Sequence, residues 1–199
     1  MVGAVSLKSH RTVDDLAAIV SRLGAEFALT AADYDAKAEF PAQNIKRLHE
    51  TGLLSLTIPT SLGGAGSGLA EAVQAVSGIA KGEPSTGLVL ALQYVTNNRV
   101  TTKIPFGERI ARSIVSEGAL INILRVEKDL GTPVRGGLPS ATARRVPGGW
   151  RITASKLYST GSHALSWLGV WAKSDDAEPL VGRMQAKGLK TARLERVEK

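Results

Sequence analysis

The stretch that decides the fold of the second half of this chain is GGWRITASKLYSTGSHALSWLGVW, from Gly148 to Trp171. Trp150, Ile152 and Ala154 alternate with polar residues, which is typical of a half-buried strand entered through a Gly-Gly turn. Residues 165–171 repeat the alternation of apolar positions. The stretch therefore predicts two strands joined by a polar turn, residues 156–162.

The polar turn combines one large aromatic side chain with several hydroxyl groups. Tyr158 offers a flat face, and Ser159, Thr160 and Ser162 can donate or accept hydrogen bonds. Gly161 allows the backbone to approach a ligand closely. Residues of these types are also common in ordinary turns. The turn alone therefore fits either a plain connection or a site for a planar cofactor.

A longer pattern around the turn favours the second interpretation. The order G-W-x-(I/L)-x-x-x-K-x-(W/Y)-x-T, from Gly149 to Thr160, resembles the start of the middle β-domain in the acyl-CoA dehydrogenase superfamily of flavoproteins. The resemblance implies that Tyr158 packs near the flavin and that the Thr160 hydroxyl reaches the isoalloxazine ring. Ser159 joins them as an expected cofactor-binding residue, with FAD as the expected cofactor and FMN as the alternative.

A second match lies in the first half of the chain and occurs in the order that the family shows. It consists of Phe40-Pro41, Leu48, Glu50, Gly52-Leu53, Ile58-Pro59 and the glycine-rich 63–66. A third element, Val126 to Pro133, keeps the family's acidic residue and glycine as Glu127 and Gly131. We accordingly expect Glu127 at the cofactor site.

Val126 stands where the family usually has a hydroxyl. That change makes the chain similar to the sulfur-acquisition and desulfurisation branch, whose members can act as reduced-flavin monooxygenases. The expected function is α,β-dehydrogenation of an acyl thioester by an FAD-dependent enzyme, with such a monooxygenase or an inactive remnant as alternatives. The resemblance also implies homo-oligomeric full-length relatives. We expect the chain to be an N-terminal fragment without the family's catalytic base.

Apolar spacing predicts helices throughout the first half. Residues at intervals of three and four from Leu16 to Phe27 predict a helix that begins after Thr12 and runs to about Tyr34. Pro41 suits the first position of a second helix, which Gly52 would end. Further helices are expected over 68–81, 85–98 and 107–116. The segment 85–98 is apolar on most sides, so we expect other helices to enclose it.

The remaining segments predict an extended link and a β-domain. Residues 52–66 are apolar and then broken by proline and glycine, which indicates a buried extended connection. Strand patterns follow from Ala119, at 119–124 and 140–146. The expected fold class is α+β, with a helical domain over 12–118 and a truncated antiparallel β-domain over 119–179. A disordered start, 1–11, and a basic tail, 180–199, flank them.

Composition and charge limit the function classes. The 199-residue chain is 43% hydrophobic and has no cysteine, so disulfides and cysteine metal sites are excluded. Its net charge of +7 comes largely from residues 181–199, which carry six basic and two acidic side chains. Arg135, Arg144, Arg145 and Arg151 lie among predicted strands, where a solvated face or a pyrophosphate contact explains them better than nucleic acid does.

Other functional signals are absent from the sequence. No apolar run is long enough to span a membrane, and the first residues do not resemble a signal peptide, so we expect a cytoplasmic protein. The three histidines, His10, His49 and His163, have no metal-ligand spacing. We therefore expect no metal site and assign no catalytic residue, and we expect neither nucleic acid nor membrane as a partner.

Overall fold

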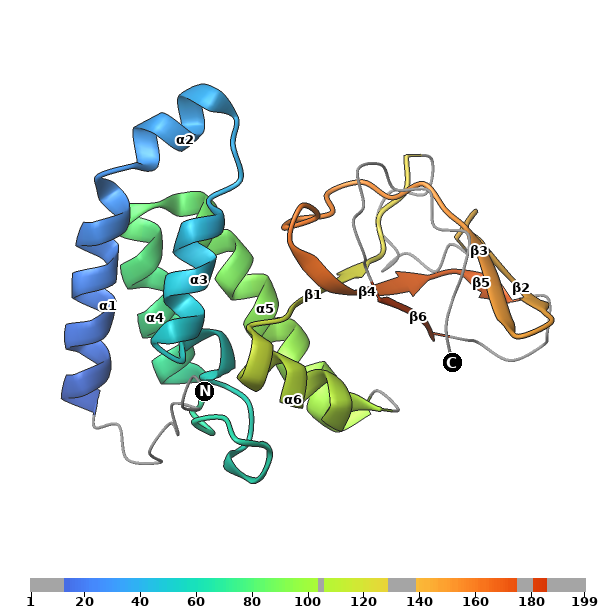
Figure 1. Cartoon of the computed structure of the whole chain (residues 1–199), viewed down its shortest axis with the longest axis horizontal. Coiled ribbons are helices and arrows are strands. Elements are labelled where there is room, and N and C mark those ends of the chain that lie inside the picture. Colours follow the sequence, from blue (N-terminus) through green and yellow to red (C-terminus); the bar gives the residue numbers. More distant parts are fainter. Residues whose placement is uncertain (1–12, 104–105, 129–138, 175–180, 186–199) are drawn as a thin grey trace, which may run out of the picture. The chain divides into compact units, whose positions relative to one another are not determined.

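The computed structural model describes residues 13–103, 106–128, 139–174 and 181–185. The chain divides into two compact units, Met1–Ala119 and Leu120–Lys199, and each is described by itself. The first is helical and the second contains the strands (Figure 1). The α+β class is therefore confirmed.

The first unit contains six α-helices within the described residues. They are α1 (Val13–Ala28), α2 (Ala31–Lys37), α3 (Ala42–Glu50), α4 (Leu69–Gly82), α5 (Pro84–Lys103) and α6 (Gly107–Glu117). Helices α1 and α4 pack closely, since an added Cβ on Gly24 would lie 2.7 Å from the carbonyl oxygen of Gly78. The largest fully buried side chains of this core include Leu23, Phe27, Leu48, Ile79, Leu90, Ile110 and Ile114.

The first predicted helix is interrupted where its apolar face ends. Phe27 is buried, whereas the next large apolar residue, Leu29, is 84% exposed. The amides of Leu29 and Thr30 turn back to carbonyl oxygens three residues earlier, which tightens and closes the helix. Helix α2 follows and buries no side chain. The prediction of one helix to Tyr34 was therefore wrong, because no residue from Ala28 to Phe40 is buried and could anchor a longer helix.

The 52–66 link is buried as predicted, but it is not extended. It forms two 3₁₀ turns, η1 (Leu53–Ser55) and η2 (Thr60–Leu62), and buries Leu53, Leu54, Leu56 and Ile58. Side chains of α5 satisfy its carbonyl groups. Tyr94 donates its hydroxyl to the oxygen of Leu53 at 2.8 Å, and Asn97 donates its amide to the oxygen of Leu54 at 3.1 Å.

The same contacts explain why α5 is not enclosed on all sides, contrary to expectation. Gln93, Tyr94, Thr96 and Asn97 are buried, so one face of the helix turns polar groups inward toward the link and its neighbours. The apolar side chains on another part of the helix are consequently left outside. Leu88 is 53% exposed and Val95 is 54% exposed.

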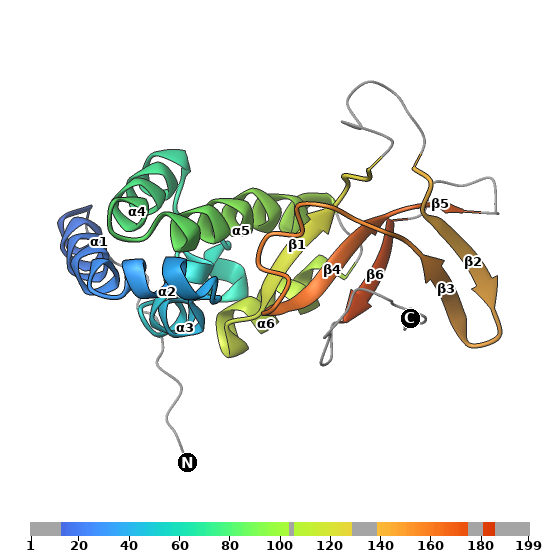
Figure 2. The same cartoon turned by 90° about the horizontal axis from the view of Figure 1, so that it is seen from above.

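The second unit contains two small mixed sheets. One has the order β1-β4-β6, with β1 (Leu120–Leu124) parallel to β4 (Leu165–Trp171) and β6 (Val181–Gln185) antiparallel to β4. The other has the order β3-β2-β5, in which β2 (Thr142–Val146) pairs with β3 (Gly149–Thr153) as an antiparallel hairpin and with β5 (Lys173–Ser174) in parallel. Figure 2 shows the β2–β3 hairpin and β4 with its two neighbours.

Two details of the predicted β-domain are corrected. The sheets are mixed rather than wholly antiparallel, because β4 follows a long excursion and joins β1 in the same direction. Residues 181–185, which we assigned to a basic tail, form β6 against β4. The rest of that tail, the expected disordered start and Gly131 lie outside the described residues. Within the described part of the chain, no helix is both long and apolar enough to cross a membrane.

Candidate functional site

The polar turn connects β3 to β4 and is closed by hydrogen bonds within its own backbone. The amide of Thr160 donates to the oxygen of Tyr158 at 2.8 Å, and the amide of Ser162 donates to that of Ser159 at 2.9 Å. Gly161 has a φ of 79°, a conformation that favours glycine. The turn therefore holds one defined shape without regular secondary structure.

Tyr158 is the most conspicuous residue of the turn. Its side chain is 82% exposed, and its φ of 53° lies in the left-handed region that non-glycine residues rarely adopt. Such a conformation costs on the order of 1 kcal/mol and is concentrated at functional sites. The Tyr158 ring is thus exposed on a strained backbone, while Ser159 and Thr160 beside it are half-buried.

Asn122, in the centre of β1, fixes the position of Thr160. It is buried, and its amide nitrogen donates to the main-chain oxygen of Thr160 at 3.1 Å. Its side-chain oxygen accepts from the amide of Ile123 at 2.7 Å, which orients the group. Asn122 is not among the residues selected from the sequence, although one polar residue inside the apolar run LINIL is a signal that could have identified it.

A buried ion pair holds the start of the turn. Lys156 Nζ lies 2.6 Å from Glu127 Oε1 and also donates to the main-chain oxygen of Trp171 at 2.6 Å. The other contacts of Glu127 are neutral donors: the amide and hydroxyl of Ser140 at 2.6 Å and 2.7 Å, and the amide of Ala141 at 3.1 Å. Next to Lys156, the amide of Leu157 donates to the oxygen of Val126 at 3.0 Å.

These contacts determine the charge state of the carboxyl group. Burial by itself raises the pKa of Glu127, but the hydrogen bonds from Lys156, Ser140 and Ala141 outweigh it and lower the pKa to about 2. Glu127 is therefore a carboxylate at neutral pH. Both of its oxygens already accept hydrogen bonds from the protein, so its direct role is to anchor neighbouring segments.

The structure therefore brings the four sequence-selected residues into one unit in two different settings. Tyr158, Ser159 and Thr160 lie within the turn itself, and Glu127 lies outside it, joined to its first residue, Lys156, by the ion pair. His163, at the end of the turn, is exposed. No group of acidic and histidine side chains suited to a metal ion occurs among the residues that the structure describes.

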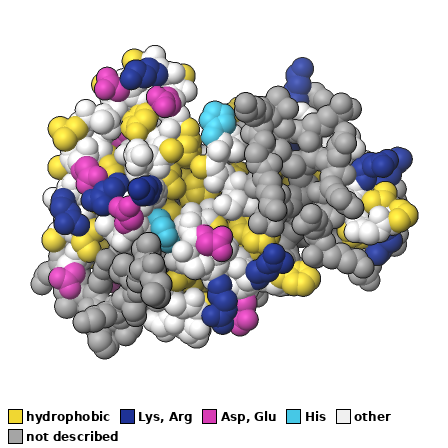
Figure 3. Space-filling view, in the orientation of Figure 1, with side chains coloured by type: hydrophobic (Ala, Val, Ile, Leu, Met, Phe, Trp, Pro, Cys, Tyr) yellow, Lys and Arg dark blue, Asp and Glu magenta, His cyan; other side chains and the backbone are white. Residues whose placement is uncertain are grey.

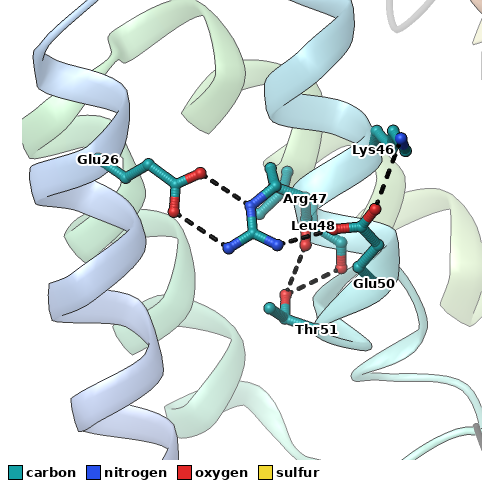
Figure 4. Close-up of polar contacts among 6 residues, drawn as sticks. All are labelled: Glu26, Lys46, Arg47, Leu48, Glu50 and Thr51. Carbon is teal, nitrogen blue, oxygen red and sulfur yellow. Dashed lines mark hydrogen bonds and ion pairs between the residues drawn. The ribbon is translucent and has the colours of Figure 1, made fainter.

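Two arrangements of charged residues in the helical unit join or cap helices. Arg47 of α3 contacts both oxygens of Glu26 in α1, at 2.8 Å and 3.2 Å, and one oxygen of Glu50 at 2.7 Å (Figure 4). Figure 3 shows basic and acidic side chains interspersed on the face of the helical unit that is seen in the orientation of Figure 1. The carboxylate of Glu83 caps the first turn of α5 through the amides of Ser85 and Thr86. Neither arrangement forms a cavity with reactive groups.

Comparison with known proteins points to one family. Residues 14–102 match the sequence profile described as "Acyl-CoA dehydrogenase, N-terminal domain". Residues 14–102 are therefore similar to the N-terminal domain of the acyl-CoA dehydrogenase family. YdbM of Bacillus subtilis, which carries an acyl-CoA dehydrogenase name, is 30% identical over 162 residues, or 80% of this chain. The human mitochondrial short-chain specific acyl-CoA dehydrogenase is 28% identical over 164 residues.

The match to these acyl-CoA dehydrogenases is partial in length. The chain spans 42% of YdbM and 37% of the human enzyme. Benzylmalonyl-CoA dehydrogenase of Aromatoleum aromaticum is 26% identical over 75% of this chain, which spans 40% of that protein.

Solved structures show that the fold extends through both units. FMN-bound TdsC of Paenibacillus superposes with a TM-score of 0.73 and 20% identity, over 84% of this chain and 42% of that one. Methanesulfinate monooxygenase MsuC of Pseudomonas fluorescens gives a TM-score of 0.71 at 21% identity, over 85% of this chain and 42% of that one. At this identity the likeness concerns the acyl-CoA dehydrogenase-type fold and not the reaction.

Proposed function

We propose that this chain supplies the flavin-contacting turn of an FAD-dependent acyl-CoA dehydrogenase, which oxidises an acyl thioester between its α and β carbons in the whole protein. The observation that carries the proposal is the polar turn, where an exposed aromatic ring on a strained backbone stands beside two hydroxyl groups. The match of residues 14–102 to the family's N-terminal domain and the dehydrogenase names of the sequence relatives support the reaction class.

The chemistry of the turn fits a planar, hydrogen-bonding ring system. In the proposed site the Tyr158 ring packs against the flavin, and the hydroxyls of Thr160 and Ser159 face its polar edge. Gly161 has no side chain to obstruct the approach of the ring. The bound flavin supplies the acceptor for the electrons that leave the substrate, and the protein orients it. We assign no catalytic base among the described residues.

A reduced-flavin monooxygenase is the second candidate. TdsC and MsuC, which share the fold, carry FMN or monooxygenase in their names, and Val126 replaces the hydroxyl that is usual in dehydrogenases. FMN would then be the cofactor. An inactive remnant is the third candidate, and it predicts that no flavin binds. Cytoplasmic location and homo-oligomeric assembly are further proposals, which cell fractionation and light scattering would test.

The test is a visible absorption spectrum of the purified chain after incubation with FAD or FMN and removal of free flavin. We expect a retained flavin band that is lost in Thr160→Val and in Tyr158→Ala. Thr153→Val, an exposed threonine in β3, is the matched control and should keep the band. A folded chain that retains neither flavin, or a band that survives both turn substitutions, would contradict the assignment of this turn.

A preference for one of the two flavins separates the candidates further. Retention of FAD over FMN would favour the dehydrogenase, because FMN lacks the adenylate half. Retention of FMN would favour the monooxygenase. Turnover of short acyl-CoA thioesters with an artificial electron acceptor, measured on the longer protein, then tests the dehydrogenase reaction itself.

A further inference from the structure

The Lys156–Glu127 pair is unusual because both side chains are almost completely buried. Their exposed fractions are 5% and 4%. Removing two charges from water is costly, and well-packed neutral groups of similar volume often stabilise a protein as well or better. Stability alone is therefore a weak reason for a buried pair at this place. Its location relative to the polar turn gives a better one.

The pair joins four segments that are distant in sequence. Glu127 follows β1, and it binds the amides of Ser140 and Ala141 just before β2. Lys156 opens the polar turn and also binds the oxygen of Trp171, the last residue of β4. A single lysine thus fixes where the turn begins relative to both sheets of the unit.

The turn is attached to the sheets at two places. At its start, Lys156 binds Glu127 and the amide of Leu157 binds the oxygen of Val126. Near its other end, Asn122 binds the oxygen of Thr160. Tyr158 and Ser159 lie between the two attachments and are therefore the part whose position both attachments control.

We infer that Lys156 and Glu127 form a positioning pair, which places Tyr158 and Thr160 for the flavin without contacting it. This inference deepens the proposed function and rests on it. The buried pair fixes the position of the turn because the Lys156 ammonium group binds two acceptors in different segments, Glu127 and the oxygen of Trp171. It can reach both in only one arrangement of the turn. A neutral side chain of the same size would fill the space and leave that arrangement unspecified.

The decisive experiment compares Lys156→Met, Glu127→Gln and the double variant in the full chain. Each single substitution leaves a buried polar group without its partner, so both should lower the thermal midpoint. The double variant removes the unpaired charge and should regain most of that midpoint. If the pair positions the turn, flavin affinity stays weakened in the double variant, by roughly 10-fold or more.

Two further measurements keep the inference separate from the proposed function. Amide hydrogen exchange of residues 157–162 without flavin should be faster in all three variants than in the unsubstituted chain. Ile152→Ala, a buried residue of β3, is the control for general loss of stability in the same unit. It should lower the midpoint and leave exchange in the turn close to that of the unsubstituted chain.

The outcomes are distinguishable. If the unsubstituted chain binds neither FAD nor FMN, the proposed function fails, while hydrogen exchange still decides whether the pair fixes the turn. If the double variant regains both stability and flavin affinity with slow exchange in the turn, the pair is only structural and the inference is overturned. An affinity loss in Ile152→Ala equal to that of Lys156→Met would overturn it as well.

Discussion

The amide of Asn122 donates a 3.1 Å hydrogen bond to the main-chain oxygen of Thr160, and the two residues lie 38 positions apart in the chain. This contact ties the centre of β1 to the turn that we assign to flavin binding. Asn122 is buried, and its side-chain oxygen already accepts a hydrogen bond from the amide of Ile123. Its side chain therefore cannot rotate toward another partner without losing this second hydrogen bond.

Asn122→Ala should loosen the turn and weaken flavin retention. It leaves the oxygen of Thr160 and the amide of Ile123 without their side-chain partner, which costs about 1–3 kcal/mol. Denaturant unfolding and a flavin titration would measure the two effects. Gln43→Ala, an exposed residue at the start of α3, is the control and should change neither. Unaltered flavin affinity in a destabilised Asn122→Ala would mean that Thr160 does not need this contact.

The second unit should lose stability in acid through Glu127. Its pKa is lowered from 4.5 to about 2 by folding, so its contribution is complete above the unfolded value and is lost as the pH falls from about 5 to about 2. The loss is on the order of 3 kcal/mol. All three tryptophans, Trp150, Trp167 and Trp171, lie in this unit, so tryptophan fluorescence reports its unfolding selectively.

Glu127→Gln provides the control for this acid transition. In this variant the second unit should be less stable at neutral pH than in the unsubstituted chain. Its stability should also change less between pH 5 and pH 2. An equal acid dependence in both proteins would assign the transition to other carboxyl groups.

Within α3, neighbouring residues should differ greatly in their contribution to stability. Arg47 makes three hydrogen bonds to Glu26 and Glu50, but the side chains are between 37% and 41% exposed, so water and salt screen the pairs. Arg47→Met should change the midpoint little, and less still at high salt. Leu48 is fully buried, so Leu48→Ala should lower the free energy of unfolding by about 2–5 kcal/mol. Helical circular dichroism during thermal unfolding would compare them.

Gly64→Ala should disturb the link under α5 by a direct clash. A Cβ at this position would lie 2.1 Å from the oxygen of Ile58, far inside contact distance. The 3₁₀ link must then shift, so we expect a loss of several kcal/mol. Gly68→Ala is the matched control, because its nearest neighbour is the flexible Glu71 carboxylate at 3.4 Å. Equal midpoints for the two variants would contradict the close approach.

The local part of the fold could be predicted from residue patterns. Strands β2 and β3 lie where alternation and the Gly-Gly turn predicted strands, because these signals are local to each strand. Helices α3, α4 and α6 begin and end within a few residues of the predicted bounds, because caps and apolar spacing act over one or two turns. Helix α1 was overextended, since spacing alone cannot tell where the buried partner surface ends.

The site could be predicted only in part for the same reason. Tyr158, Ser159 and Thr160 are adjacent in the chain, so their shared turn was visible as a sequence motif. Asn122 and Lys156 were missed as site residues. Their partners lie far along the chain, and no local pattern states which acceptor a buried lysine or asparagine will face.

The sequence by itself determined the α+β class, the apolar faces of most helices, the strand segments β2 and β3 and the residues of the turn, because these depend on backbone preferences and on periodicities of 3.6 and 2 within short segments. The tertiary structure alone decided that β4 runs parallel to β1, that α5 turns Tyr94 and Asn97 inward, and that Lys156 meets Glu127 beneath the turn. Each of these depends on satisfying buried polar groups between distant segments, which only the packed chain can do.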